Sequence, residues 1–141
     1  MSTDETTATW PDVRSDAKSQ EFFAAAEAGE LRIRRCTDCA ALLAPESTTC
    51  LECYSTELEW ITAAGTGTVV TWTVVHRAPS PAFAALVPYT VAVVELTEGP
   101  WLYTRLADGV PDRAGAPVRA VYLQASGGEH YPIFTLTEGS L

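Results

Sequence analysis

Hydrophobic and polar residues alternate with a period of two through most of the C-terminal half of the chain. In TGTVVTWTVVH, and again in YTVAVVEL, β-branched and aromatic residues recur at close spacing. This pattern predicts strands that turn one face toward a core. Turns containing glycine separate the strands. Five strands joined in this way fit a small closed barrel or a sandwich. The predicted strands are Thr66–His76, Tyr89–Leu96, Trp101–Arg105, Val118–Gln124 and Tyr131–Leu136.

A helical pattern replaces this alternation nearer the N-terminus. The alanine-rich stretch Ser15–Ala28 places Phe22 and Phe23 at helical spacing from later alanines. Ser15 is a suitable N-cap, and Gly29 stands where a left-handed residue ends many helices. The next residues, Glu30–Arg35, alternate apolar and charged side chains, which predicts a short strand.

These patterns divide the chain into three parts. Residues 1–14 are polar and acidic apart from Trp10, and we expect a flexible N-terminal tail. Residues 15–59 hold the helix and all four cysteines, and residues 60–141 hold the predicted barrel. The apolar segment Arg77–Pro88 fits neither period. Two interpretations of this segment stay open, a cap on the barrel and a contact surface or lid.

Composition and charge narrow the classes of function. The chain has 141 residues, of which 47% are hydrophobic, and a formal net charge of −9. An acidic surface repels phosphate, so binding to nucleic acid or to anionic membranes is disfavoured. The sequence has no apolar stretch of the roughly 20 residues that cross a bilayer. Because the N-terminus also lacks the features of a signal peptide, we expect a cytoplasmic protein with reduced thiols.

The four cysteines form two CxxC pairs separated by ten residues. They are Cys36, Cys39, Cys50 and Cys53. This spacing is typical of a zinc ribbon, in which two tight turns aim four soft thiolates at one tetrahedral ion. A site whose four positions are all filled by protein predicts structural rather than catalytic zinc. Iron in the same cage, a redox-active CxxC pair and four free thiols are the competing interpretations.

The residues after each CxxC pair are unusual. Turns of this kind favour glycine after the second cysteine, because glycine tolerates a positive φ angle. Here those positions hold Ala40 and Tyr54. The sequence therefore predicts either a strained turn or a turn that closes differently.

The order of these features resembles a family of acyl-CoA-associated proteins, once catalogued as a domain of unknown function. The resemblance implies a mainly β fold, with an N-terminal helix and a rubredoxin-like zinc ribbon followed by a five-stranded OB-fold barrel. It covers nearly the whole chain after the tail. The matching segments are Glu21–Cys39, Ala44–Cys53, Trp60 with Gly65-Thr-Gly67, Pro88–Gly99 and Tyr131–Phe134.

The resemblance also implies a function. Members of this family are accessory subunits of thiolase-superfamily enzymes, among them thiolases and steroid side-chain aldolases. We therefore expect a non-catalytic subunit of a hetero-oligomer that stabilises its partner enzyme and helps bind the acyl-CoA. The partner, the acyl group and the stoichiometry stay open.

Two sets of residues are candidates for contacts with such partners. Apolar side chains expected to meet the partner enzyme are Phe22, Phe23, Phe83 and Leu86. Arginines expected to meet the phosphates of CoA or an acidic partner surface are Arg32, Arg34, Arg35 and Arg105. The alternatives are packing within the chain for the first set and a solvated strand face for the second.

Two other classes of function stay open. Zinc ribbons and OB barrels also occur in modules that bind single-stranded nucleic acid, although such modules need a basic groove. A stand-alone acyl-CoA-binding protein or enzyme is the other class. Against catalysis, the only histidines are His76 and His130, and neither lies in a recognisable catalytic motif, so we expect no catalytic residues.

Overall fold

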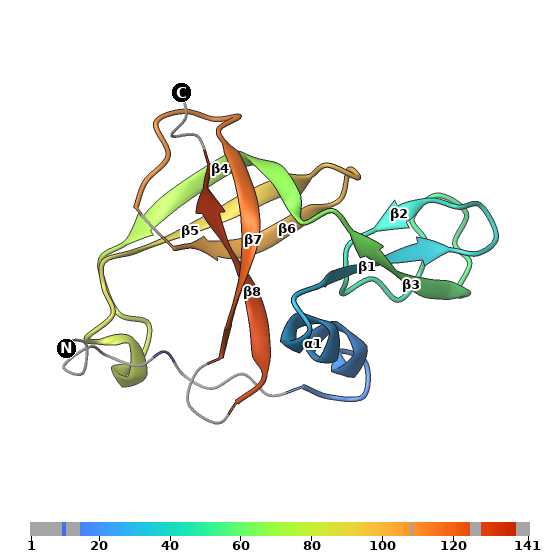
Figure 1. Cartoon of the computed structure of the whole chain (residues 1–141), viewed down its shortest axis with the longest axis horizontal. Coiled ribbons are helices and arrows are strands. Elements are labelled where there is room, and N and C mark those ends of the chain that lie inside the picture. Colours follow the sequence, from blue (N-terminus) through green and yellow to red (C-terminus); the bar gives the residue numbers. More distant parts are fainter. Residues whose placement is uncertain (1–9, 11–14, 108, 125–127, 138–141) are drawn as a thin grey trace.

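The computed structural model describes residues 10, 15–107, 109–124 and 128–137. It has a mainly β fold, in which one helix and a three-stranded sheet precede a closed five-stranded barrel (Figure 1). The predicted fold class is thus confirmed, whereas the predicted tail, except Trp10, lies outside the described residues. The elements are α1 (Gln20–Glu27), β1 (Leu31–Cys36), β2 (Leu42–Leu43), β3 (Leu58–Ala63), β4 (Thr66–Val75), η1 (Pro81–Phe83), β5 (Tyr89–Leu96), β6 (Trp101–Leu106), β7 (Pro117–Gln124) and β8 (His130–Leu136).

Helix α1 begins later than the sequence predicts. Ser19, not Ser15, holds the N-cap position, and the Ser15 hydroxyl donates to Oε2 of Glu129 at 2.8 Å. Asp16 and Ser19 instead close a turn before the helix, in which the Ser19 amide donates to Oδ1 of Asp16 at 2.9 Å. Short polar side chains that bond nearby backbone in this way favour turns over helix.

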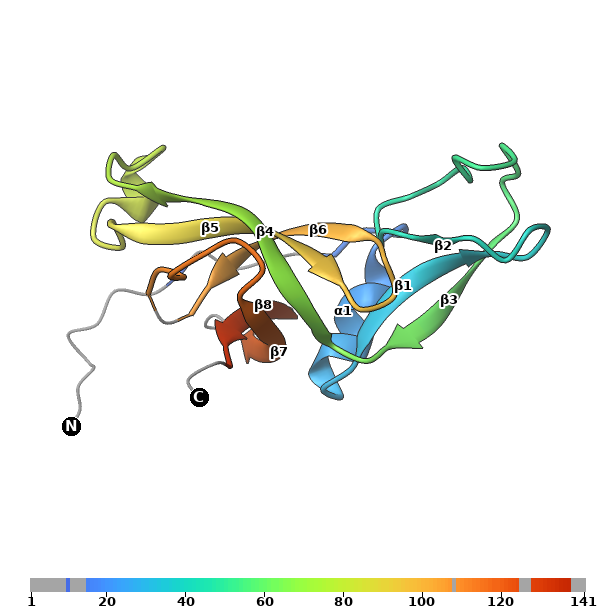
Figure 2. The same ribbon diagram turned by 90° about the horizontal axis from the view of Figure 1, so that it is seen from above.

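The other end of α1 agrees with the sequence. Gly29 has a φ of 78°, and its amide donates to the carbonyl of Ala26 at 3.0 Å. Ala25 and Ala26 are buried, and the helix packs on β1 and β8. Figure 2 shows α1 where the three-stranded sheet meets the barrel. The small alanine side chains let the helix lie close to both.

The three-stranded sheet is antiparallel, with the order β2-β1-β3. β3 pairs with the whole of β1, from Leu58 opposite Cys36 to Ala63 opposite Leu31. The expected division of the chain between residues 59 and 60 therefore falls inside β3. Neither β2 nor β3 was predicted from the sequence, since the two residues of β2 are too few to show a period and LEWITA in β3 alternates only weakly.

The barrel closes in the order β4-β5-β6-β8-β7. Neighbouring strands are antiparallel except β6 and β8, which run parallel and pair at Leu106 and Phe134. Each strand end lies within one residue of its predicted position. Gly67 permits the close approach of β4 and β5, since an added Cβ would lie 2.4 Å from the Glu95 carbonyl oxygen.

One hydrophobic core connects the barrel to the three-stranded sheet. Phe134 and Val94 are completely buried inside the barrel. Leu31 and Ile33 of β1 belong to the same cluster of contacting side chains. A change that unfolds β1 should therefore also lower the stability of the barrel.

In the part of the chain that the structure describes, no helix has the length and apolarity needed to cross a membrane.

Candidate functional site

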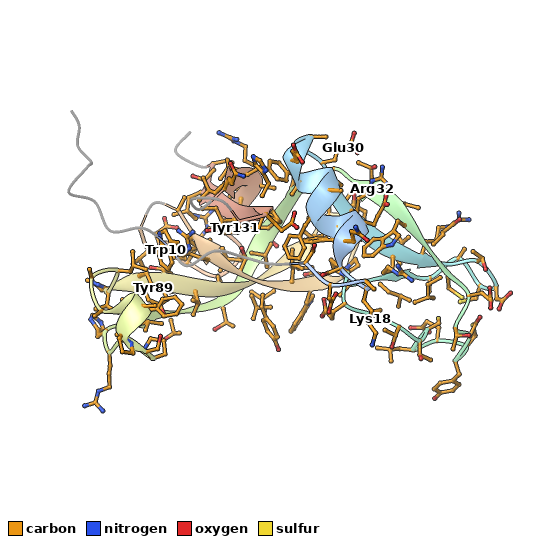
Figure 3. All side chains as sticks on the ribbon, turned by 90° about the horizontal axis from the view of Figure 1, so that it is seen from below. Trp10, Lys18, Glu30, Arg32, Tyr89 and Tyr131 are labelled. Carbon is orange, nitrogen blue, oxygen red and sulfur yellow. The ribbon has the colours of Figure 1, made fainter. Side chains whose placement is uncertain are left out.

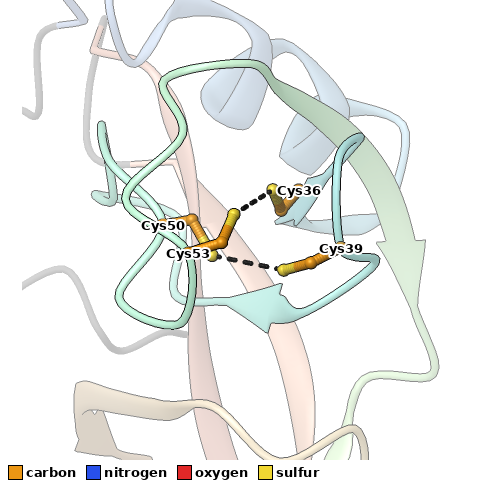
Figure 4. Close-up of side chains that lie close together, drawn as sticks. All are labelled: Cys36, Cys39, Cys50 and Cys53. Carbon is orange, nitrogen blue, oxygen red and sulfur yellow. Dashed lines mark hydrogen bonds between the residues drawn. The ribbon is translucent and has the colours of Figure 1, made fainter.

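The four cysteines converge at one end of the three-stranded sheet (Figure 4). Cys36 ends β1 and Cys39 follows in the next turn, while Cys50 and Cys53 come from the turn before β3. All four Sγ atoms lie within 4.8 Å of one another. The Sγ atoms of Cys36 and Cys53 are 3.6 Å apart, as are those of Cys39 and Cys50.

These distances fit one tetrahedral zinc ion. Zn–S bonds of about 2.3 Å in a tetrahedron separate the sulfurs by about 3.8 Å. A disulfide would need about 2.05 Å, so the pairs are not oxidised. Because four thiolates complete the coordination, no position is left for water or substrate. The quartet is a structural zinc site, as predicted.

Two residues in the left-handed backbone conformation close the turns that hold the sulfurs. Ala40 has a φ of 67° and Tyr54 a φ of 65°. Their amides donate to the carbonyls of Cys36 at 2.8 Å and Cys50 at 2.9 Å. The turns thus have the conformation that glycine would favour, and non-glycine residues adopt it at a cost.

We expect Tyr54→Gly to stabilise the zinc-bound protein by about 0.5–1 kcal/mol, because relief of the left-handed strain exceeds the added chain entropy of glycine. Little packing is lost, since the Tyr54 side chain is 78% exposed. Thermal unfolding should show a melting temperature a few degrees higher. Tyr103→Gly is the matched control. Tyr103 is 84% exposed but lies in β6, so there glycine should destabilise. A lower melting temperature for Tyr54→Gly would contradict the expectation.

The thiols of Cys50 and Cys39 have pKa values shifted in opposite directions. Burial of Cys50 opposes its ionisation, but the amides of Cys53 and Glu52 and the thiols of Cys39 and Cys53 lower its pKa to about 7. The Ala41 amide favours the Cys39 thiolate, but burial and the neighbouring thiols together raise its pKa to about 12. Neighbouring thiolates repel one another, and a divalent cation removes that repulsion and displaces the protons.

The described residues form two large surface clefts beside the barrel. The first, here called the α1 cleft, has a volume of about 690 Å³ and lies between α1, the loop 45–48, β3 and β6. Its lining includes Phe22, Phe23, Arg34, Trp60, Leu102 and Tyr103. The second, here called the barrel cleft, has a volume of about 750 Å³ and lies on β4, β5 and β6. Its aromatic lining is Trp10, Trp72, Phe83, Tyr89, Tyr103 and Tyr131. Tyr103 borders both clefts.

The four apolar residues proposed for partner contact do not form one patch. Phe22 and Phe23 pack edge to face at 5.2 Å between ring centroids and line the α1 cleft. Phe22 also packs against the hydrophobic core. Phe83 lies in the barrel cleft, whereas Leu86 lines neither cleft and is half-buried.

Two of the four arginines bind carboxylates of this chain. Nη1 of Arg32 lies 2.8 Å from Glu21, and its Nη2 lies 3.4 Å from Glu30. Figure 3 shows Glu30 and Arg32 beside the helix. Arg35 lies 2.7 Å from Glu59, its partner across the β1–β3 pair.

The other two arginines stack on tryptophan rings. The guanidinium of Arg34 lies 4.3 Å from the ring centroid of Trp60, its cross-strand partner. The guanidinium of Arg105 lies 3.6 Å from the ring centroid of Trp10. The two stacked arginines border different clefts, Arg34 the α1 cleft and Arg105 the barrel cleft.

The most exposed aromatic surface of the barrel was not predicted from the sequence. Trp101 is 56% exposed and Tyr103 84%. The two alternate with the less exposed Leu102 and Thr104 along β6, so both side chains point outward. The signal that could have found them is the odd-numbered period Trp101, Tyr103, Arg105.

Comparison with known proteins agrees with this architecture. Residues 23–59 match the rubredoxin-like zinc ribbon domain of ChsH2, and residues 60–123 match its C-terminal OB-fold domain. A solved structure, the Ltp2-ChsH2(DUF35) aldolase, contains a chain 38% identical with a TM-score of 0.74. The match covers 86% of this chain and 96% of that one. A DUF35 protein from Sulfolobus solfataricus, 14% identical with a TM-score of 0.57, shares the fold.

Two curated relatives carry different names. A probable enoyl-CoA hydratase alpha subunit from Thermomonospora curvata is 41% identical over 115 residues, which cover 80% of this chain and 35% of the relative. A DUF35 domain-containing scaffold protein from Methanocaldococcus jannaschii is 36% identical over 91 residues, 62% of this chain and 64% of the relative. The chain thus spans about a third of the hydratase subunit's length. By sequence, fold and cysteine geometry, it belongs to the ChsH2 (DUF35) family, whose members join a rubredoxin-like zinc ribbon to an OB-fold domain.

Proposed function

We propose that this chain is a non-catalytic accessory subunit that binds and stabilises a thiolase-like enzyme, a thiolase or an aldolase acting on an acyl-CoA such as a steroid side-chain ester. The likeness to almost the whole of one chain of the Ltp2-ChsH2(DUF35) aldolase supports an aldolase as the partner. The scaffold name of the Methanocaldococcus jannaschii relative supports a role in assembly rather than chemistry.

The observation that carries the proposal is the exposed aromatic surface on β6. Large aromatic side chains seldom stay in water without a partner when they form a contiguous patch. Trp101 and Tyr103 point outward from one strand, and Tyr103 borders the α1 cleft beside Phe23. Aromatic side chains of this kind dominate the energy of protein interfaces. We assign partner docking to Trp101, Tyr103 and the α1 cleft.

Within this surface, Arg34 is the candidate for contact with an acidic group. It borders the α1 cleft and stacks on Trp60, and its charge is not engaged by a carboxylate in the described contacts. Arg32 and Arg35 already neutralise carboxylates of this chain, so we do not propose them as contacts to CoA phosphates.

The test is co-expression with each thiolase-like enzyme encoded in the same genome, followed by gel filtration and native mass spectrometry. We expect one stable hetero-oligomer that contains zinc, and higher solubility of the enzyme in the presence of this chain. The stand-alone alternative predicts acyl-CoA binding or turnover by the isolated chain. Elution apart from every such enzyme would contradict the proposal.

A further inference from the structure

We propose that the barrel cleft is a binding site for a flat, apolar ring system that carries a carboxylate or another anionic group, and that the indole of Trp10 occupies part of it. This inference goes beyond partner docking. It concerns the isolated chain and does not require the proposed function.

The cleft has the size and lining of a small-molecule site. Its volume of about 750 Å³ falls within the roughly 300–1,000 Å³ typical of such sites. Its floor is the outer face of the sheet, where Thr73, Val91 and Arg105 stand in register across β4, β5 and β6. Aromatic rings form the walls, and few polar groups converge on the space. Apolar walls with few polar groups suit a ligand that is mostly hydrocarbon.

The charge of the cleft selects for an anion. Arg105 is the one charged side chain among the described residues that line it. Its Nη2 donates to the hydroxyl of Tyr131 at 3.2 Å, which brings two polar groups together at one side. Arg32, Arg35 and Arg113 each have a carboxylate within 3.0 Å. Within the described residues, the guanidinium of Arg105 contacts an aromatic face and a phenol but no carboxylate. An incoming carboxylate would therefore complete its charge pairing.

The indole of Trp10 is an example of a ring that fits the barrel cleft. Its indole lies over the guanidinium of Arg105 at 3.6 Å and meets Tyr89 edge to face at 5.1 Å between ring centroids. The ring centroid of Phe83 lies 6.1 Å from that of the same indole. Figure 3 shows Trp10, Tyr89 and Tyr131 gathered on the part of the barrel away from the zinc ribbon. A fused ring of similar size would make these contacts too, and an anionic edge would add the charge pairing that indole lacks.

The experiment measures the affinity of the full, zinc-bound chain for 2-naphthoate and for the neutral 2-naphthylmethanol by calorimetry. Wild-type chain should prefer the anion. Trp10→Ala should bind 2-naphthoate about tenfold more tightly, because the indole that competes for the cleft is gone. The size of the gain reflects the one cation–π contact and the two aromatic pairs that the indole makes. Adding Arg105→Gln to Trp10→Ala should remove the preference for the anion. Arg105→Lys, which keeps the charge without the planar fork, should retain part of it.

Arg119→Gln is the matched control, since Arg119 is exposed on β7 and does not line the cleft. It should leave both affinities unchanged, and thermal melts should show that every variant is folded. Equal affinity of Trp10→Ala for the two probes would overturn the assignment of an anion site. Weaker binding of 2-naphthoate by Trp10→Ala than by wild type would show that Trp10 forms a wall of the site, and would overturn the claim that its indole competes with the ligand. These outcomes are independent of whether the chain binds a thiolase-like enzyme.

Discussion

Cys50→Ser should abolish stoichiometric zinc binding and unfold the ribbon. A serine hydroxyl does not replace a thiolate as a soft ligand, so the tetrahedral site is lost. Zinc-finger peptides gain about 10–16 kcal/mol from zinc at neutral pH, which far exceeds what a small apolar cluster supplies. The cluster around this site contains only Cys36, Leu43 and Cys50 as buried members. The metal therefore carries most of the ribbon's stability.

The loss should also reach the barrel, because Leu31 and Ile33 of β1 pack into its core. Metal analysis together with far-ultraviolet circular dichroism should show less than one zinc per chain and a melting temperature lowered by tens of degrees. Glu52→Gln, in the same turn but exposed, is the matched control and should keep its zinc. Wild-type zinc content and melting in Cys50→Ser would be incompatible with a four-cysteine site.

Tyr103→Asp should weaken binding to the partner enzyme at least about thirtyfold. The reason is that a hot-spot aromatic residue contributes about 2 kcal/mol or more, and a buried carboxylate adds a desolvation cost. Because Tyr103 is 84% exposed, the isolated chain should fold normally. Surface plasmon resonance with the immobilised partner measures the change. Phe23→Asp, in the α1 cleft, should have a similar effect.

Val110→Asp provides the comparison for this prediction. Val110 is also exposed, at 53%, but lies in the loop between β6 and β7 and borders neither cleft. Its replacement should leave the affinity within about twofold. If Tyr103→Asp and Phe23→Asp bind as tightly as Val110→Asp, the docking surface lies elsewhere on the chain.

Local patterns in the sequence were sufficient to predict most of the fold and the whole zinc site. Strands such as Tyr89–Leu96 combine alternation with bounding turns, and these two signals act within a few residues. For Ala40 and Tyr54 the sequence left open a strained turn and a turn that closes differently, and their positive φ angles correspond to the strained turn. The predicted start of α1 was wrong because the side chains of Asp16 and Ser19 each accept a hydrogen bond from the other's backbone amide and form a turn there, which composition does not reveal.

The surface clefts depend on tertiary packing that local patterns do not contain. Arg32 and Arg34 are on the same face of a strand by sequence pattern. In the structure Arg32 forms an ion pair with Glu21, whereas Arg34 stacks on Trp60. Trp10 meets Arg105 although the two residues lie 95 positions apart in the sequence. Cross-strand register decides such contacts, and register becomes visible only once the strands are paired.

Acyl-CoA turnover by the purified partner enzyme, with and without this chain, tests the accessory role most directly. The account predicts negligible turnover by this chain alone, low or unstable activity of the enzyme alone, and full activity of the mixture at a fixed stoichiometry. Turnover by the isolated chain, or an enzyme equally active and stable in its absence, would contradict the account.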